Sequence, residues 1–220
     1  MISQPSYSVE LTDIERSMVY RMEILENSQQ IETKNGTFVR TRVGINAGGR
    51  MVNAMVALIA RNKQEWPDDE RYIDSRMVSH AKGLILSESS TEHDRLPCSL
   101  VVTHPDMLAT WSCALESAGL KFTATKKLNI LEKIILDDQD VVVVTPSLFN
   151  TCVNFGTNRA WKRLIIDPTD IIIPNMAKPV AGFYWILSEN PGCLVARGNL
   201  NTNRLIKEII GKDPNVEQNF

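Results

Sequence analysis

The chain has 220 residues, of which 43% are hydrophobic and 23% charged, and its formal net charge at pH 7 is -2. This composition excludes a disordered tail, a collagen-like rod and a coiled coil, and the slightly acidic balance gives no support for a globally basic nucleic-acid binder. No stretch approaches the ~20 continuous apolar residues of a membrane span and no secretory signal opens the sequence, so we expect an intracellular protein without a membrane partner.

The first third of the chain predicts a helix, a strand and a second helix, in that order. Apolar residues recur at steps of three and four over residues 11–25, which indicates a helix with Thr12 or Asp13 as its N-cap. Residues 38–45 alternate in the manner of a strand, and residues 51–60 are apolar almost all round, as in a buried helix.

Residues 65–94 differ in kind from the rest of the sequence. They hold eight acids against three bases, a net charge of -5, and have little periodicity apart from the apolar run 84–86. We interpret them as a solvated acidic insertion with one strand in it. Within it, the acidic stretch 68–70 is typical of a solvated loop but could dock on a basic partner.

From residue 99 onward, short apolar runs alternate with helical patterns. The sequence predicts strands at 99–103, 121–125, 141–145, 164–166 and 183–187, and helices at 105–118, 128–136 and 202–210. This alternation predicts an α/β domain in which helices cover both faces of a mostly parallel sheet.

Ligands of α/β sheets collect beyond the carboxyl ends of the strands, and a glycine loop stands at the first such end. Gly44, Gly48 and Gly49 provide the glycine spacing of the phosphate-binding template G-x-x-x-x-G-K-[ST]. The lysine of that template is Arg50 here, and its Mg²⁺-binding hydroxyl is Met51, which cannot ligate a hard cation. A simple tight turn between strand and helix explains the glycines equally well.

An acidic residue follows the predicted strand at 164–166. In a nucleotide hydrolase such a carboxylate holds the metal and the next one orients the attacking water. Here Asp167 is followed by Pro168, which has no carboxylate, and then by Asp170. We favour turn formation and helix capping for the two aspartates and predict no metal site.

Taken in order, these segments resemble the first RecA-like lobe of superfamily 2 helicases and translocases. The likeness is nearest to the helicase-like proteins of large cytoplasmic DNA viruses, related to the poxvirus early-transcription and nucleoside-triphosphatase type. It spans roughly residues 10 to 211 and rests on five segments: 44–51, 100–111 (LVVTHPDMLATW), 141–150 (VVVVTPSLFN), 161–170 (WKRLIIDPTD) and 183–191 (FYWILSENP). The resemblance implies a helical segment at 1–30 packed on one RecA-like lobe at 31–220, with the acidic insertion inside it and no second lobe.

The same resemblance implies that the catalytic motifs are degenerate. Arg50 and Met51 replace the lysine and hydroxyl, Pro168 replaces the catalytic glutamate, and the coupling motif reads Ser188, Glu189, Asn190 and Pro191. Without these groups phosphoryl transfer loses both positioning and charge stabilisation. We therefore predict a pseudo-ATPase with no catalytic residues and no cofactor. It would act as a scaffold among other subunits of a virion or viral transcription complex, in the particle or in the host cytoplasm.

Two alternatives remain open at this point. One is a nucleic-acid-binding module without hydrolysis, in which Thr103, His104, Thr145 and Ser147 contact phosphates, although His104 by itself is typical of a turn. The other is a triphosphatase lobe that a partner subunit completes, with ATP and Mg²⁺ as cofactors.

Two residue types are expected to be structural. The tryptophans at 111, 161 and 185 suit core or edge packing better than base stacking. The four cysteines at 98, 113, 152 and 193 form no CxxC pair, so we expect reduced, buried thiols.

Overall fold

The computed structural model describes residues 10–32, 36, 38–40, 43–46, 52–61, 71–80, 85–168, 171, 173, 176–177 and 179–188. At 30–32, 38–40, 71–80 and 85–92 it describes the backbone alone. Within these ranges no helix has the length and apolar character needed to cross a membrane.

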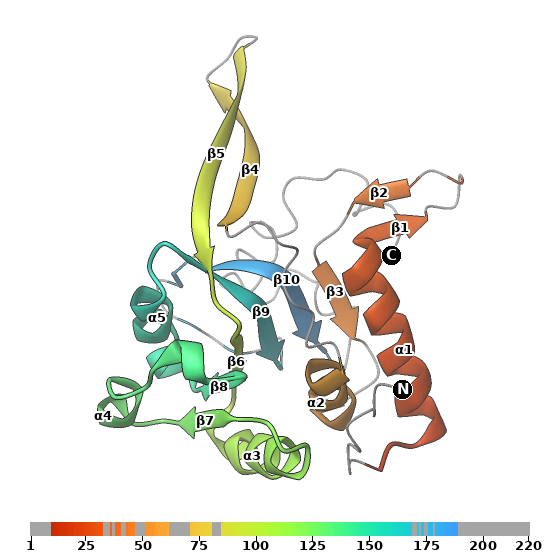
Figure 1. The fold of residues 1–220 in the computed structure, drawn as a ribbon, viewed down its shortest axis with the longest axis vertical. Helices are drawn as coiled ribbons and strands as arrows, with labels where there is room; N and C mark the ends of the chain where they lie inside the picture. The colour runs from red at the N-terminus through yellow and green to blue at the C-terminus, as the bar shows by residue number, and fades with distance from the viewer. Residues whose placement is uncertain are drawn as a thin grey trace, which may run out of the picture.

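Strands and helices alternate from residue 99 to residue 167, whereas several strands follow one another before that segment (Figure 1). The helices are α1 (Asp13–Ser28), α2 (Val52–Arg61), α3 (Leu108–Ser117), α4 (Leu128–Leu131) and α5 (Pro146–Phe155), with 3-10 turns η1 (Pro105–Met107) and η2 (Leu136–Asp138). The strands are β1 (Gln30–Glu32), β2 (Phe38–Arg40), β3 (Val43–Asn46), β4 (Arg71–His80), β5 (Ile85–Arg95), β6 (Ser99–Thr103), β7 (Phe122–Thr125), β8 (Val141–Val144), β9 (Arg159–Asp167) and β10 (Val180–Leu187).

An eight-stranded, mostly parallel sheet forms the centre of the molecule. Six strands follow one another in the order β3-β10-β9-β6-β8-β7, and every neighbouring pair is parallel. β5 pairs in parallel with the start of β9, and β4 pairs antiparallel with β5. The predicted parallel α/β sheet is confirmed.

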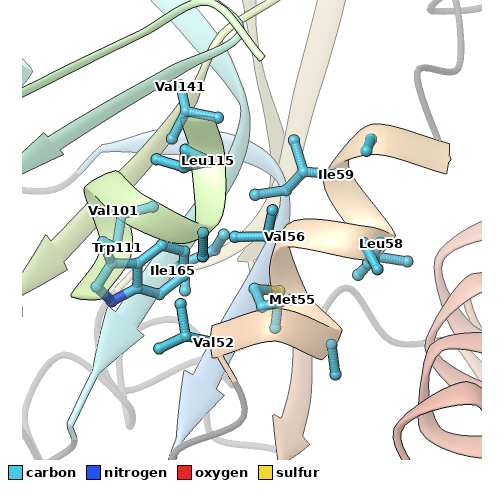
Figure 2. Packing of buried hydrophobic residues seen from close by; sticks show 14 of the residues in the cluster. Val52, Met55, Val56, Leu58, Ile59, Val101, Trp111, Leu115, Val141 and Ile165 are labelled. Atoms are coloured by element: carbon cyan, nitrogen blue, oxygen red, sulfur yellow. The ribbon is translucent and has the colours of Figure 1, made fainter. Parts of the chain in front are cut away.

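Helices cover both faces of this sheet, because successive side chains of each buried strand point to opposite sides. On one face, α1, α2 and α3 enclose a core with Val101, Val141 and Ile165 (Figure 2). On the other face, α4 and α5 enclose a second core with Val102 and Val144. The sequence predicts a buried helix at 51–60. In the structure residues 52–60 of α2 are buried, with the exception of Asn53.

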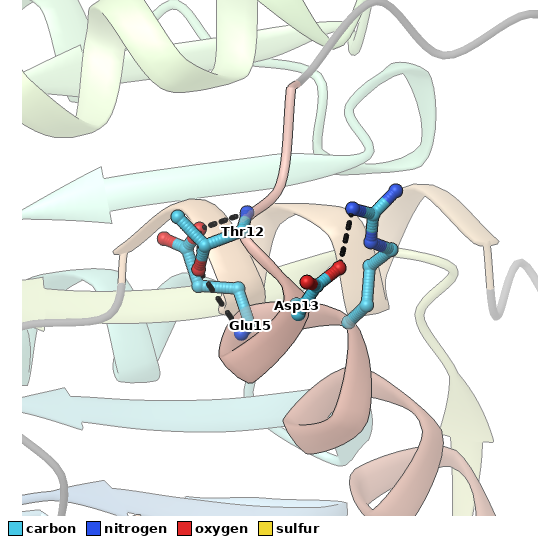
Figure 3. A network of polar contacts seen from close by, with 4 residues as sticks. Thr12, Asp13 and Glu15 are labelled. Atoms are coloured by element: carbon cyan, nitrogen blue, oxygen red, sulfur yellow. Dashed lines mark hydrogen bonds and ion pairs between the residues drawn. The ribbon is translucent and has the colours of Figure 1, made fainter.

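A capping box starts α1 (Figure 3). The Thr12 backbone N–H donates to Oε2 of Glu15 at 2.8 Å, and the Glu15 N–H donates to the Thr12 hydroxyl at 3.3 Å. Such a cap stabilises a helix by about 1 kcal/mol. Thr12 is thus the cap, one of the two that the sequence predicts, and Val19 and Met22 of α1 enter the core beside α2.

Three predicted elements are wrong in detail. Residues 38–45 are two strands in different sheets, β2 paired with β1 and β3 paired with β10, because alternation of side chains does not reveal a change of partner. Residues 65–94 contain two long strands instead of one, since a ribbon rich in hydroxyl and charged residues lacks an apolar period. The helix expected at 128–136 ends at Leu131, and a 3-10 turn follows at Leu136.

Two further outcomes concern helix bounds. The helix expected to start at Pro105 begins as the 3-10 turn η1 and becomes α-helical at Leu108. The helix predicted at 202–210 lies outside the described residues.

Candidate functional site

The carboxyl ends of the six parallel strands carry one buried polar residue each. We call this set the polar row. It consists of Asn46 (end of β3), Ser188 (after β10), Asp167 (end of β9), Thr103 (end of β6), Thr145 (after β8) and Thr125 (end of β7). Parallel strands place these ends along one edge of the sheet, which is where α/β proteins bind ligands.

Asp167 is the acidic residue of the polar row, and it is buried. Its side chain is 1% exposed, and its Oδ2 accepts a hydrogen bond from the indole Nε1 of Trp111 at 2.8 Å. The hydroxyl of Thr103 lies 3.5 Å from the same oxygen. The sequence favoured turn formation and helix capping for Asp167. In the structure its carboxylate instead forms hydrogen bonds with a residue of α3 and a residue of the neighbouring strand β6.

This environment does not suit a Mg²⁺ ligand. Mg²⁺ binds carboxylates that leave room for several of its waters, whereas Asp167 is closed off and faces an indole donor. The next residue, Pro168, supplies neither a carboxylate nor an N–H, and Asp170 lies outside the described residues. Asp167, as the structure places it, therefore does not fit the role of a Mg²⁺ ligand.

Only the first glycine of the predicted phosphate loop belongs to the described part of the chain. Gly44 lies in β3 in register with Trp185 of β10, and a Cβ added to Gly44 would stand 2.2 Å from the indole ring. Packing thus explains why this position is a glycine. Residues 48–51 (Gly48, Gly49, Arg50 and Met51) lie outside the described residues.

The start of the predicted coupling motif joins the polar row. The backbone N–H of Ser188 donates to the carbonyl of Asn46 at 2.9 Å, so the end of β10 is tied to the end of β3. The rest of the motif (Glu189, Asn190 and Pro191) lies outside the described residues.

The four predicted nucleic-acid contacts lie at two neighbouring strand ends. The hydroxyls of Thr145 and Ser147 are 3.0 Å apart at the start of α5, and within the described residues no side chain caps that helix. Thr103 is buried, whereas His104 is exposed, with its Nδ1 3.3 Å from the Asp106 carboxylate. The structure therefore brings hydroxyls and a helix start together at this part of the edge.

A buried polar network on the α1 face is a feature that the sequence reasoning missed. Glu26 accepts from Nε and Nη2 of Arg163 at 2.6 and 2.7 Å, and its Oε1 also accepts from the Trp185 indole at 2.7 Å. All three side chains are buried. Two features of the sequence could have indicated this network. Glu26 follows Met22 by four residues on the apolar face of α1, and Arg163 lies inside an apolar strand.

The cysteines divide into two groups. Cys98 and Cys152 are buried free thiols, as predicted, whereas Cys113 is exposed, so the expectation fails there; Cys193 lies outside the described residues. Burial raises the pKa of Cys152 to about 12 and raises that of Cys98 as well. Within the described ranges no three His, Cys, Asp or Glu residues gather as a metal site would require.

Comparison with known proteins supports the fold. No family model and no curated protein matches the sequence. The structure is similar to the Sulfolobus solfataricus SWI2/SNF2 ATPase core solved in complex with dsDNA, with a TM-score of 0.52 and 14% sequence identity. The similarity covers 96% of this chain and 45% of that chain, so this chain spans less than half of its length. The predicted α/β RecA-like fold is thereby confirmed.

Proposed function

We propose that this chain is a catalytically inactive helicase-like lobe that serves as a structural subunit of a larger assembly. The observation that carries the proposal is the bond between Trp111 and Asp167, which commits an oxygen of the strand-end carboxylate to the protein interior. The assembly would be a viral particle or transcription complex, as the sequence resemblance implies, with the chain in the particle or the host cytoplasm.

Three sequence positions support the loss of catalysis. Arg50 has a planar guanidinium that does not replace a compact ammonium in a tight loop, and Met51 offers no oxygen to Mg²⁺. Pro168 cannot orient water. Loss of even one acid or base group costs ~10²–10⁴-fold in rate, so the combination leaves no useful turnover.

A thermal melt with Mg·ATP tests this proposal. A ligand present at 100 times its Kd stabilises the folded state by ~2.7 kcal/mol, which raises the Tm of a domain of this size by several degrees. We expect the Tm to be the same with Mg²⁺ alone and with Mg·ATP, and phosphate release to equal the protein-free blank. A Tm rise of several degrees, or phosphate release above the blank, would contradict the proposal and favour a lobe completed by a partner.

A second candidate function is a nucleic-acid module without hydrolysis, which the hydroxyl pair of Thr145 and Ser147 at the start of α5 favours. Backbone N–H groups at a helix start bind phosphate oxygens. The similar archaeal ATPase core was solved with dsDNA, which is a property of that protein. Saturable, salt-sensitive DNA binding that Ser147→Ala weakens would support this candidate. Absence of such binding leaves the scaffold function.

A further inference from the structure

Strand β7 is the last strand at one side of the central sheet (Figure 1). Its pairing with β8 decides which of its backbone groups are used. The N–H of Val141 donates to the carbonyl of Lys121 at 3.2 Å, and Phe122 stands in register with Val141. Because the backbone groups of successive strand residues point to opposite sides, the N–H and C=O of Phe122 and Ala124 point away from β8. Within the described part of the chain no strand pairs with this outer edge.

The outer edge of β7 has few of the features that keep other strands away. Proteins protect such edges with proline, a bulge or charged side chains, or by keeping the edge strand short. β7 is short, but its residues 122–125 (FTAT) include no proline and no charge, and its register with β8 is unbroken. The side chains of Phe122 and Ala124 pack against the core on the α3 face, which anchors the strand. β7 is therefore a preformed template to which an extended segment can add.

A wholly exposed segment follows β7 at the carboxyl end of this edge. All five residues at 126–130 (KKLNI) are exposed, and they include two lysines and two large aliphatic residues. Leu128 is 46% exposed and Ile130 is 42% exposed. Lysines alone would serve to keep a second strand away, whereas aliphatic side chains gathered in one exposed segment are typical of an interaction site.

The two ends of the edge differ in charge. At the amino end, the carboxylate of Asp140 accepts a hydrogen bond from the backbone N–H of Lys121 at 2.9 Å, so an acid stands there together with the exposed lysine. At the carboxyl end, Lys126 and Lys127 are exposed and segment 126–130 contains no acid. A strand that adds to β7 therefore meets an excess of positive charge at the carboxyl end, which acidic residues complement.

We propose that the outer edge of β7 binds an extended segment of a partner protein that combines apolar residues with acids at one end. The backbone of this segment pairs with Phe122 and Ala124, as in other cases of strand addition. Its apolar side chains cover the aliphatic residues of segment 126–130, and its acids lie beside the two lysines. The inference rests on the proposed function, because it gives a structural subunit the surface that joins it to a neighbour.

A second copy of the chain and nucleic acid suit this edge less well. Two β7 strands paired antiparallel would bring Lys126 and Lys127 of one copy to Lys121 of the other, with only Asp140 at that end to offset three lysines. Bases of single-stranded nucleic acid stack on aromatic or guanidinium planes, and segment 126–130 has neither.

Selection from a phage-displayed library of short random peptides, on the immobilised wild-type chain, tests the inference. We expect the selected peptides to combine acidic residues with β-branched or aromatic residues, which favour strands. One selected peptide is then synthesised with a fluorescent label, and its affinity is measured by fluorescence anisotropy. The affinity should fall as salt is raised, because exposed charges contribute to it.

Three variants remove separate parts of the contact. Ala124→Pro removes an outward N–H that makes no bond to β8, a change that edge strands tolerate, and should weaken peptide binding roughly tenfold. Lys126→Glu/Lys127→Glu should weaken it by roughly tenfold or more, because like charges then meet. Ile130→Ser should weaken it roughly threefold or more, since less apolar surface is covered.

The controls make the same chemical changes on α1, which lies at the other side of the fold (Figure 1). Arg16→Glu/Arg21→Glu reverses two exposed cations, and Ile24→Ser replaces an isoleucine that is 49% exposed. Both control variants should bind the peptide like the wild type. If Ala124→Pro melts early, the lysine reversal and Ile130→Ser are compared with these controls alone.

Several results would overturn the inference. They are a library that yields no binder, selected peptides without acids, and a peptide that binds the folded edge variants as tightly as the wild type. Self-association of the wild type that Ala124→Pro abolishes would assign the edge to a second copy instead. Binding of a labelled oligothymidylate that the lysine reversal abolishes and Ala124→Pro leaves intact would assign segment 126–130 to nucleic acid.

Failure of this inference is distinguishable from failure of the proposed function. Absent peptide binding together with an unchanged Mg·ATP melt overturns the inference alone. A rise in Tm with Mg·ATP overturns the proposed function whatever the peptides do.

Discussion

Trp185 lies over Gly44 so closely that a Cβ at the glycine would stand 2.2 Å from Cζ3 of the indole ring. The ring is held from its other end, because its Nε1 donates to Oε1 of Glu26 at 2.7 Å. The tryptophan is therefore fixed between helix α1 and strand β3, and it cannot shift to admit a side chain.

Substitution of Gly44 with alanine should lower the free energy of unfolding by about 1–3 kcal/mol or more, since overpacking of a buried site costs that much. Urea denaturation measures the change. Gly156→Ala is the matched control, because its Cβ would stand 3.2 Å from the Trp161 ring, and it should cost less. Trp185→Leu should cancel most of the additional cost of Gly44→Ala in the double variant. Equal costs for the two alanine variants would contradict this account.

Glu26→Gln should destabilise the fold strongly. The change leaves the guanidinium of Arg163 buried without its counter-charge, and loss of one partner from a buried ion pair costs ~3–5 kcal/mol. Glu23→Gln on the same helix is the control, because the pair that Glu23 makes with Arg61 is partly exposed and should contribute only ~0.2–1 kcal/mol. Chemical denaturation of both variants checks the difference, and a similar small cost for both would rule the explanation out.

Trp111→Phe should cost stability out of proportion to the small change in ring volume. Phenylalanine fills most of the cavity but donates no hydrogen bond, and a buried polar group that loses its partner costs ~1–3 kcal/mol. Asp167→Leu, which removes the acceptor at similar side-chain volume, should be less harmful in the Trp111→Phe background than in the wild type, since the two residues interact. A double-mutant cycle by urea denaturation measures this coupling, and additive costs would mean that the bond contributes nothing.

The alternation of strands and helices after residue 99 was sufficient to predict the parallel sheet, because buried strands such as 141–144 have no polar face. The site was harder to predict. Gly44 matched a phosphate-loop template, yet its packing against Trp185 depends on a strand 141 residues later in the chain (185 minus 44). Likewise Asp167 was recognised as a strand-end acid, but its bond to Trp111 depends on how α3 packs, which no local pattern records.

Thiol reactivity should distinguish the cysteines of the native chain. The thiolate is the reactive form, and burial raises the pKa of Cys152 to about 12 and also raises that of Cys98. In a Cys193→Ser variant, mass spectrometry after brief iodoacetamide treatment at mildly alkaline pH should find label on the exposed Cys113 and little on the other two. All three should react in urea. Rapid native labelling of Cys152 would contradict its burial.

The ion pair between Asp137 and Arg159 should make a small, pH-dependent contribution to stability. The hydrogen bond from Arg159 lowers the pKa of Asp137 below its usual 3.8. The folded state thus favours the charged carboxylate, so the contribution is fully present above pH 3.8 and is lost as the pH falls through the lower folded-state value. Because Asp137 is more than half exposed, Asp137→Asn should cost only ~0.2–1 kcal/mol at neutral pH, and this cost should vanish in strong acid. Urea denaturation across this pH range measures the cost, with Asp138→Asn as the control. A cost that stays constant in acid would show that the amide harms the fold for a reason other than charge.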